Sequence, residues 1–517
     1  MLVYNNCTTD ARVLKEAQTL SASGHAVRIV AVLDRTTVPR EMRDGVEIVR
    51  IDRNPVHFRL LRFVRRRRRE GRLARAGVKR ALRRFARVTR KLIRATRRFI
   101  RTSRPSAGRQ TLGRIRAALA ALLAQAMPSN DGVLEQRPAA ARSAGMRLLV
   151  FSVRSIGAAC FAVYSLMRAV FRLPGRVYRG ISHLMYTTLM RFHKPLMFID
   201  WYWRTYKLLR RSRIDFVHAN DLITLPAAVP LAKRTGAQLI YDAHELYPEV
   251  STLSRLEATV WRLLERPLIK RADRVMTVCD SIARELVFRY QVRLPVVLLN
   301  CPPRSVRTGH GNHELLRLKA GLNDNPEPIV LYQGGFAPNR GLPALVGAAG
   351  LWRHGVLVLM GWGKLEEELR AMIADQGLSE RVVITGPVGQ SDLLDFTAGA
   401  DVGVIPYEPI GLNNTYTMPN KLFEYIAAGL PIVATDLPEL RRVLHGDGLG
   451  LTFETVSPTA IAATVDRVLD NQALRAEMRT NLLRVQARYT WESQVPVLLE
   501  LYRPHHASPP TLLTSVP

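Results

Sequence analysis

A lysine and a glutamate stand three residues apart in a stretch of this sequence that begins with a turn-rich loop. The segment reads NNTYTMPNKLFEYIAAGLPIVA from residue 413 to residue 434. Pro419 at the start of a short helix would place Lys421 and Glu424 on neighbouring positions of one helix face. A lysine suits a phosphate group, and a glutamate suits hydroxyl groups. The alternative is a surface ion pair, which explains the two charges but not the loop around them.

A second candidate for phosphate binding is a glycine-rich loop. Gly334, Gly335, Arg340 and Gly341 fall between a predicted strand and a helix that would begin near Pro343. Backbone amides at the start of that helix and the arginine side chain could bind a diphosphate. Taken alone, these residues are explained as simply by a turn with a solvated arginine.

Polar residues also end two predicted strands in the first half of the chain. Asp221 closes the segment DFVHAND (215–221), and His244 lies within YDAHE (241–245). An α/β sheet presents its ligand-binding groups at the carboxyl ends of its strands, so both residues are candidates for one cleft. The alternative for His244 is a hydrogen-bonded core residue.

Alternating strands and helices would position these residues. The first run has strands at 2–5, 26–33, 46–51, 216–220, 238–242 and 274–279, with helices at 11–21, 224–234 and from 281. The second run has strands at 329–333, 356–360, 382–385, 402–406 and 432–435. This alternation predicts an α/β fold with two parallel sheets, right-handed crossovers and a ligand cleft between the sheets.

The net charge of +33 is concentrated in one segment that interrupts the first run. Residues 59–116 hold 24 Lys and Arg against one acidic residue, and residues 117–213 hold 15 against three. The other residues number 37 basic and 39 acidic, which is nearly neutral. The basic segment therefore has a role of its own.

Apolar residues recur at helical spacing within this segment, and arginines fill the other faces. They are Val78, Leu82, Phe85, Val88, Leu92, Ala95 and Phe99. The pattern predicts a basic amphipathic helix, which suits an anionic membrane surface. A solvated or partner-packed helix and nucleic-acid contact are alternatives, although few aromatic residues are present here for base stacking.

Other features bear on the compartment of the protein. The four cysteines form no disulfide-like or zinc-like pattern, and charged residues interrupt the N-terminus before any secretory signal could form. The apolar segment 155–167, flanked by Arg154 and Arg168, is too short to cross a hydrocarbon core of about 30 Å as a helix. We predict a cytoplasmic protein bound peripherally to the inner face of the cell membrane, with a disordered tail.

Six segments together resemble the retaining glycosyltransferases of the GT-B superfamily, family four, known as the group 1 glycosyl transferases. They are DARVLKEA (10–17), GHAV (24–27), HAND (218–221), YDAHE (241–245), GWG (361–363) and NKLFEY (420–425). The resemblance covers about residues 1–52 and 205–502. It implies two Rossmann-like domains that face a cleft, with the basic, mainly helical insert in the N-terminal domain.

The resemblance also implies a division into domains. Residues 1–52 and 205–304 would form the N-terminal acceptor domain, interrupted by the insert at 53–204. Residues 305–480 would bind the nucleotide sugar. A C-terminal helix at 481–502 would cross back to the N-terminal domain, and 503–517 would be the disordered tail.

Roles for single residues follow from the resemblance. His244 would lie near the transferred sugar and Glu424 would bind the ribose, which makes these two the catalytic candidates. The donor diphosphate would contact Arg340, Lys421, Gly334 and Gly335. The nucleotide and its sugar would contact Gly361, Gly363, Asn414, Tyr416 and Asn420. The acceptor side would include Asp10, Arg12 and Asp221.

Two departures from the family pattern stand out. Tyr416 occupies the position of the first of two family glutamates, so Asn414 or the backbone would replace that contact to the donor sugar. The glycine-rich loop that commonly follows the first strand is replaced by residues 5–10, with the sequence NNCTTD.

The implied activity is transfer of a hexose-type sugar from a UDP- or GDP-sugar, with retention, to a lipid-linked acceptor in polysaccharide or glycolipid assembly. Neither a cofactor nor a metal is expected. Fold alone does not determine function, so two alternatives stay open: a nucleotide-sugar epimerase of the same fold, and a catalytically inactive scaffold that binds anions.

Overall fold

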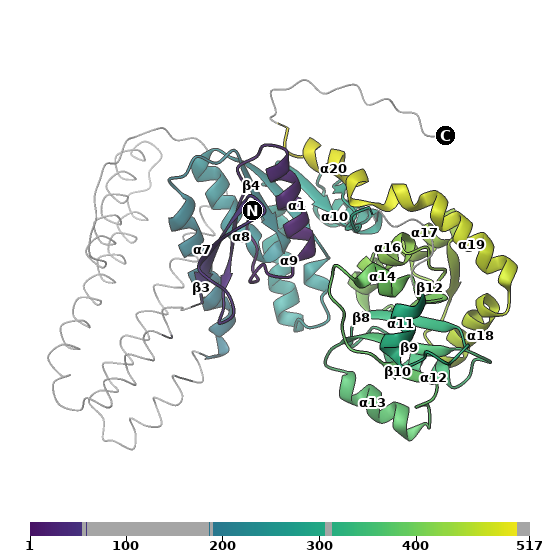
Figure 1. Cartoon of the computed structure of the whole chain (residues 1–517). Helices are drawn as coiled ribbons and strands as arrows, with labels where there is room; N and C mark the ends of the chain where they lie inside the picture. Colours follow the sequence, from purple (N-terminus) through teal and green to yellow (C-terminus); the bar gives the residue numbers. More distant parts are fainter. Residues whose placement is uncertain (54–57, 59–185, 187–189, 305–312, 504–517) are drawn as a thin grey trace, which may run out of the picture. The chain divides into compact units, whose positions relative to one another are not determined.

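The computed structural model describes residues 1–53, 58, 186, 190–304 and 313–503. The chain divides into two compact units, one formed by residues 1–53 with 201–517 and the other by residues 54–200. The predicted helix at 78–99, the apolar segment 155–167 and the predicted tail beyond residue 503 lie outside the described residues. The larger unit contains both sheets shown in Figure 1.

The first sheet is parallel except at one edge. Its order is β2 (Arg40–Arg43), β3 (Val46–Asp52), β1 (Arg28–Leu33), the chain at Leu2, β4 (Phe216–Asn220), β5 (Gln238–Ala243), β6 (Arg274–Thr277) and β7 (Val296–Val297). Leu2 bridges Val30 on one side and Ala219 on the other, so the N-terminus joins the two groups of strands. Only β2 runs antiparallel, beside β3.

The predicted strand at 2–5 is reduced to these bridges. The side chains of Asn5 and Asn6 accept hydrogen bonds from the backbone amides of Cys7 and Thr8, at 2.8 and 3.2 Å. Such side-chain caps favour a turn over a continued strand. The turn leads to Asp10, whose side chain caps α1 (Ala11–Ala22).

Four further α-helices and one 3₁₀ turn accompany this sheet: α7 (His193–Leu209), α8 (Asp221–Thr235), η1 (Tyr247–Glu249), α9 (Arg255–Ile269) and α10 (Asp280–Tyr290). Helix α8 begins at Asp221, three residues before the predicted start. Helix α7 runs through residue 204 and buries Trp201, Thr205 and Leu209. Helix α9 begins with a capping box, in which Ser254 and Glu257 satisfy each other's backbone amides.

The second sheet has six strands, all parallel. Its order is β10 (Val382–Ile384), β9 (Val356–Trp362), β8 (Ile329–Gly335), β11 (Val402–Ile405), β12 (Ile432–Thr435) and β13 (Gly450–Phe453). The helices that go with it are α11 (His313–Ala320), α12 (Leu342–Ala349), α13 (Glu366–Asp375), α14 (Leu393–Thr397), α15 (Gly411–Thr415), α16 (Asn420–Ala427), α17 (Pro438–Asp447) and α18 (Pro458–Leu469). The predicted α/β fold with two parallel sheets is confirmed, although β2, β7 and β13 were not predicted.

The end of the chain packs on the first sheet. After α19 (Gln472–Val485) and η2 (Gln486–Tyr489), α20 (Trp491–Glu500) contacts α1. The indole of Trp491 donates a hydrogen bond of 2.8 Å to the hydroxyl of Thr19. Trp491, Leu498 and Tyr502 share one apolar core with Leu20 and Ile240. Among the described helices, none is long and apolar enough to cross a membrane.

Candidate active site

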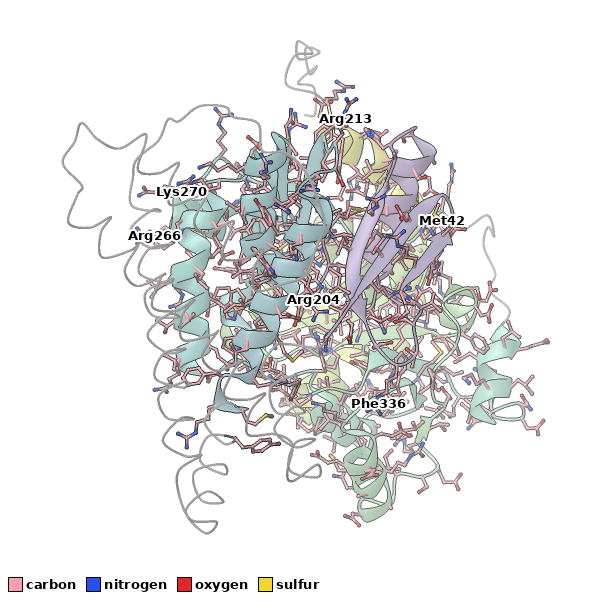
Figure 2. The ribbon with its side chains drawn as sticks, turned by 90° about the vertical axis from the view of Figure 1, so that its left-hand side faces the viewer. Met42, Arg204, Arg213, Arg266, Lys270 and Phe336 are labelled. Atoms are coloured by element: carbon pink, nitrogen blue, oxygen red, sulfur yellow. The ribbon has the colours of Figure 1, made fainter. Side chains whose placement is uncertain are left out.

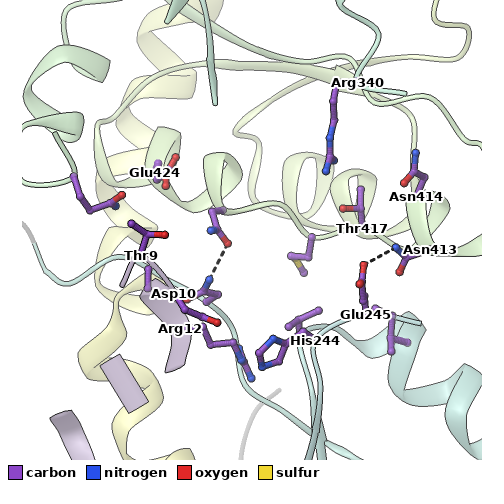
Figure 3. Close-up of a pocket in the computed structure, with 17 residues that line it drawn as sticks. Thr9, Asp10, Arg12, His244, Glu245, Arg340, Asn413, Asn414, Thr417 and Glu424 are labelled. Carbon is purple, nitrogen blue, oxygen red and sulfur yellow. Dashed lines mark hydrogen bonds between the residues drawn. The ribbon is translucent and has the colours of Figure 1, made fainter. Parts of the chain in front are cut away.

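A pocket of about 460 Å³ is lined by residues of both α/β runs. Seven of the predicted site residues line it: Asp10, Arg12, His244, Arg340, Asn414, Asn420 and Glu424. Figure 3 shows Asp10, Arg12 and His244 on one side of the pocket and Arg340, Asn414 and Glu424 on the other. The two predicted groups of residues, which come from different α/β runs, therefore form one site.

Lys421 lies behind the pocket wall as a buried cation. Its Nζ is 3.6 Å from the ring centre of Tyr332 and 4.9 Å from that of Tyr407. The guanidinium of Arg340 lies 4.0 Å from the same Tyr407 ring. Burial first, and then the charge of Arg340, hold the pKa of Lys421 well below its usual value. Two cations on one aromatic ring form a local site for an anion.

No described residue accepts a hydrogen bond from the Lys421 ammonium. Its side chain is only 6% exposed, so water cannot fully solvate it. A buried cation without a counter-ion is unfavourable, and an anionic ligand would remove that penalty. The surface ion pair that was the alternative for Lys421 and Glu424 does not describe this arrangement, because Lys421 is buried and its ammonium has no hydrogen-bond partner in the described part of the chain.

The predicted glycines act through packing. A Cβ on Gly361 would lie 1.9 Å from the carbonyl oxygen of Gly334, and one on Gly363 would lie 2.4 Å from that of Phe336. A Cβ on Gly334 would lie 3.6 Å from the Nζ of Lys421. Gly334, Gly335, Gly361 and Gly363 do not line the pocket. Gly361 and Gly363 allow the ends of β8 and β9 to approach each other closely, whereas at Gly334 the φ of +118° favours glycine and the contact with the lysine would be an ordinary one.

Glu424 is oriented by a short hydrogen-bond chain. The Gln333 amide donates a hydrogen bond of 2.6 Å to the Glu424 carboxylate, and the hydroxyl of Thr397 donates one of 2.7 Å to the Gln333 oxygen. Burial raises the pKa of Glu424. The remaining carboxylate oxygen is available to accept hydrogen bonds from ligand hydroxyls.

The segment before α16 forms an additional helix where a loop was predicted. On this helix, α15, the Asn413 side chain accepts a hydrogen bond of 3.0 Å from the backbone amide of Leu246 and donates one of 3.0 Å to the Glu245 carboxylate. Figure 3 shows the second of these bonds. Asn413 thus ties the two α/β runs together beside the pocket. Asn414 also lines the pocket, and its side-chain amide donates a hydrogen bond of 3.2 Å to the Glu408 carbonyl.

Tyr416 does not line the pocket. Its backbone carbonyl accepts a hydrogen bond of 3.2 Å from the Cys279 thiol. A different carboxylate reaches the pocket, that of Glu245, whose pKa is raised by burial. Neither Glu245 nor Asn413 was among the predicted site residues. The only signal for Glu245 was its place directly after His244 in the YDAHE segment.

His244 stands in a network of buried charges. Its Nε2 is 2.9 Å from Asp242, and its Nδ1 is 3.4 Å from Asp221. Asp242 also receives two hydrogen bonds from Arg12, at 2.8 and 3.0 Å. The third Arg12 nitrogen donates a hydrogen bond of 2.8 Å to the Leu298 carbonyl, so each of the three guanidinium nitrogens is hydrogen-bonded within the protein. Asp221 does not line the pocket and contacts it only through His244.

The described residues contain one group with metal-ligand chemistry. Ligand atoms of Glu16, His218 and Asp242 lie within 4.8 Å of one another, and all three residues are buried. Arg12 already pairs with both carboxylates, at 3.0 and 2.8 Å. The residues present therefore fit a guanidinium, which supplies the positive charge in this cluster.

Comparison with known proteins identifies the fold family. A family model described as glycosyl transferases group 1 matches residues 327–471, and a glycosyl transferase 4-like domain model matches residues 139–302. The alpha-D-kanosaminyltransferase of Streptomyces kanamyceticus is 26% identical over 323 residues, or 59% of this chain and 81% of the relative. A D-inositol 3-phosphate glycosyltransferase of Acidothermus cellulolyticus is 26% identical over 312 residues, or 56% and 67%.

The chain belongs to the group 1 glycosyltransferases of the GT-B fold. It is therefore an enzyme that transfers sugars. The second match begins at residue 139, inside the segment that the sequence pattern sets apart as an insert.

Solved structures agree on the fold of this glycosyltransferase. The sucrose-phosphate synthase of Thermosynechococcus elongatus aligns over 97% of this chain and 94% of its own, with a TM-score of 0.54 and 16% identity. The Anabaena protein HepE, solved with UDP and glucose, aligns over 59% of this chain and 81% of its own, with a TM-score of 0.50 and 16% identity.

Proposed function

We propose that this glycosyltransferase takes a hexose-type sugar from a UDP- or GDP-sugar and transfers it with retention to a lipid-linked acceptor, in polysaccharide or glycolipid assembly. One observation carries the donor: the cations of Lys421 and Arg340 share the ring of Tyr407, and the Lys421 ammonium has no hydrogen-bond acceptor among the described residues. A diphosphate is an anion that fits between two such cations.

The chemistry of the donor supports this assignment. Breaking a sugar–diphosphate bond leaves negative charge on the diphosphate, and fixed cations stabilise that charge as it develops. Lys421 and Arg340 would supply them. Glu424 would bind ribose hydroxyls through its free oxygen, and the structural relative solved with UDP and glucose supports a nucleotide-sugar ligand. Retention would follow from attack on the same face, assisted by the leaving phosphate.

We infer further that the protein binds an anionic membrane at the cytoplasmic face. Support from the described residues comes from the outer side of α9. Leu256, Val260 and Leu263 are 74%, 45% and 68% exposed, at the spacing of one helix face. Exposed basic residues surround them: Arg255, Arg262, Arg266, Lys270 and Arg271. Figure 2 labels Arg266 and Lys270.

One of these basic residues, Arg262, is paired with Glu249 at 2.8 Å. Glu265 is buried and accepts hydrogen bonds of 2.9 and 2.7 Å from Tyr241 and Tyr290, while Glu257 belongs to the capping box. A basic face with an apolar stripe fits the boundary between lipid headgroups and acyl chains. The basic segment 59–116 has the same sign of charge and cannot complement this face electrostatically.

Nucleotide release tests the transfer reaction. We would incubate the purified protein with a panel of UDP- and GDP-sugars, with and without a lipid extract of the source cells, and measure free nucleotide. The expected result is release from one donor only when lipid is present, and its loss in Glu424→Gln. Interconversion of the free nucleotide sugar without acceptor would instead establish the epimerase, and nucleotide binding without any turnover would favour the inactive scaffold.

Vesicle binding tests the membrane surface. Leu256→Glu with Leu263→Glu adds two negative charges to the α9 face, and Leu351→Glu with Leu483→Glu adds them at two leucines that are each 55% exposed in the second α/β run. The first pair should reduce co-sedimentation with phosphatidylserine vesicles at least about tenfold, and the second pair should leave it unchanged. Equal binding by both double variants would remove α9 from the membrane contact.

A further inference from the structure

Both ring nitrogens of His244 face carboxylates. The Nε2 lies 2.9 Å from Asp242 and the Nδ1 lies 3.4 Å from Asp221. A neutral imidazole has one N–H and one lone pair, so it would direct the lone pair at one of the two carboxylates. A doubly protonated ring donates toward both. The geometry therefore favours the imidazolium form.

The groups around this histidine come from four elements. Asp221 starts α8, and Asp242 is the last residue but one of β5. Arg12 and Glu16 lie on α1, and His218 lies on β4 with its Nε2 3.9 Å from Asp242. Glu245 follows His244 directly and also faces the pocket. Burial raises the pKa of Glu16 to about 8, against the opposing charge of Arg12, which lies 3.0 Å away.

Two carboxylates bear directly on the His244 ring. Asp221 and Asp242 contribute two negative charges, and Arg12, paired with Asp242, contributes one positive charge. These three groups therefore sum to one negative charge, which a cationic His244 offsets. Burial by itself would lower the pKa of His244, but the charges of Asp221 and Asp242 outweigh it and raise that pKa well above its usual value.

We propose that Asp221 is a positioning residue which, together with Asp242, keeps His244 doubly protonated, so that His244 acts on the bound donor as a fixed positive charge and takes no proton during transfer. The inference rests on the proposed function, since it assigns a role in the same pocket. It assigns to His244 an electrostatic part in stabilising the departing diphosphate, from the side opposite Arg340.

The backbone at Asp221 supports a specialised role. Its φ is +61°, in the left-handed region that residues other than glycine rarely adopt, although it is the first residue of α8. Such strain persists where the surrounding structure determines the conformation, often at functional sites. This conformation directs one carboxylate oxygen toward His244, while the other is buried without a hydrogen-bond partner in the described structure.

Nitrogen NMR of the histidine rings tests the proposal without any turnover. His244 is assigned by the signal that disappears in His244→Gln. At pH 7.5 both of its ring nitrogens should give the signals of a protonated imidazolium. In Asp221→Asn the ring should lose a proton at a pH lower by about one unit or more. Asparagine tolerates the left-handed conformation, so this variant should fold.

Asp215→Asn is the matched control, because Asp215 is an exposed aspartate six residues upstream. Asp215→Asn should leave the His244 titration unchanged. Asp221→Glu, which keeps a carboxylate, should retain part of the rise in the His244 pKa that Asp221→Asn loses. In transfer assays, Asp221→Asn should lower kcat/KM more at pH 8 than at pH 6, since the ring loses its proton as pH rises. A neutral His244 ring in the wild type at pH 7.5, or an unchanged titration in Asp221→Asn, would overturn the proposal.

The two proposals fail separately. If no donor is turned over but the NMR result is as expected, the transfer reaction is wrong and the charge state of His244 stands. If the His244 ring is neutral while sugar transfer occurs, the proposed charge state of His244 is wrong and the proposed function stands.

Discussion

The protonation of Lys421 should depend on whether an anion occupies the pocket. In the unliganded protein, burial and Arg340 keep its pKa well below the usual value. A bound diphosphate would raise that pKa, because an opposite charge stabilises the ammonium form. Binding should therefore take up a proton at any pH between the two pKa values, and the affinity should fall as pH rises through that range.

Lys421→Met tests this linkage. The variant should bind UDP or GDP about 10- to 100-fold more weakly, since it loses one charge-assisted hydrogen bond, and its proton uptake should disappear. Calorimetry in buffers of different ionisation enthalpy measures both quantities. Thermal stability should not fall, because the substitution removes an unpaired buried cation. Lys364→Met, at an exposed position, is the control. Proton uptake that persists in Lys421→Met would mean that another group titrates.

The loop between β8 and α12 sets where Arg340 enters the pocket. Gly341 ends this loop at φ +66°, and a Cβ there would lie 1.9 Å from the Pro406 carbonyl oxygen and 2.9 Å from Val456. Both the conformation and the space therefore exclude a larger residue. Gly377 has nearly the same φ, +65°, with nothing within 4 Å of an added Cβ.

These two glycines separate conformation from packing. Gly377→Ala should cost about 1 kcal/mol of unfolding free energy, from the left-handed backbone alone. Gly341→Ala should cost about 1–3 kcal/mol more, since the loop or β11 must shift. Urea unfolding measures both, and nucleotide affinity should fall only in Gly341→Ala. Equal destabilisation by the two variants would show that the close contact at Gly341 relaxes at little cost.

Over the whole molecule, the last helix completes a core that the first residues begin. Helix α20 and the two residues after it place Trp491, Leu498, Leu501 and Tyr502 against Leu20, Ile240, Met276 and Leu298. The Tyr502 hydroxyl also lies 2.5 Å from the Nδ1 of His218, next to the charged cluster. The segment that follows the second sheet is therefore part of the first sheet's core.

Truncation tests this dependence. Removing residues 491–517 takes four large apolar side chains out of that core, each contributing about 1.5–3 kcal/mol. The sum is comparable to the total stability of an ordinary domain, so the shortened chain should be insoluble or should unfold without cooperativity. Removing only residues 504–517 is the control and should leave the melting temperature unchanged. A stable, cooperative protein ending at residue 490 would contradict the packing described.

Local patterns in the sequence determined much of this protein. Runs of apolar residues between turn signals predict both parallel sheets, because a buried strand needs side chains that avoid water on both faces. Pro419 and the spacing of Lys421 and Glu424 predict the helix that carries them, since helix periodicity is a local property. The concentration of arginines in residues 59–116 is likewise a property of the sequence alone.

Only the tertiary structure decided which charges meet. Arg12 and Asp242 are 230 residues apart, and the order of strands in the sheet brings them to a bidentate contact. No local periodicity encodes that order. For the same reason the sequence pattern left Asn413 and Glu245 without a role, and it could not reveal that both nitrogens of His244 face carboxylates. Packing between distant segments fixes these distances, and the chemistry of the pocket depends on them.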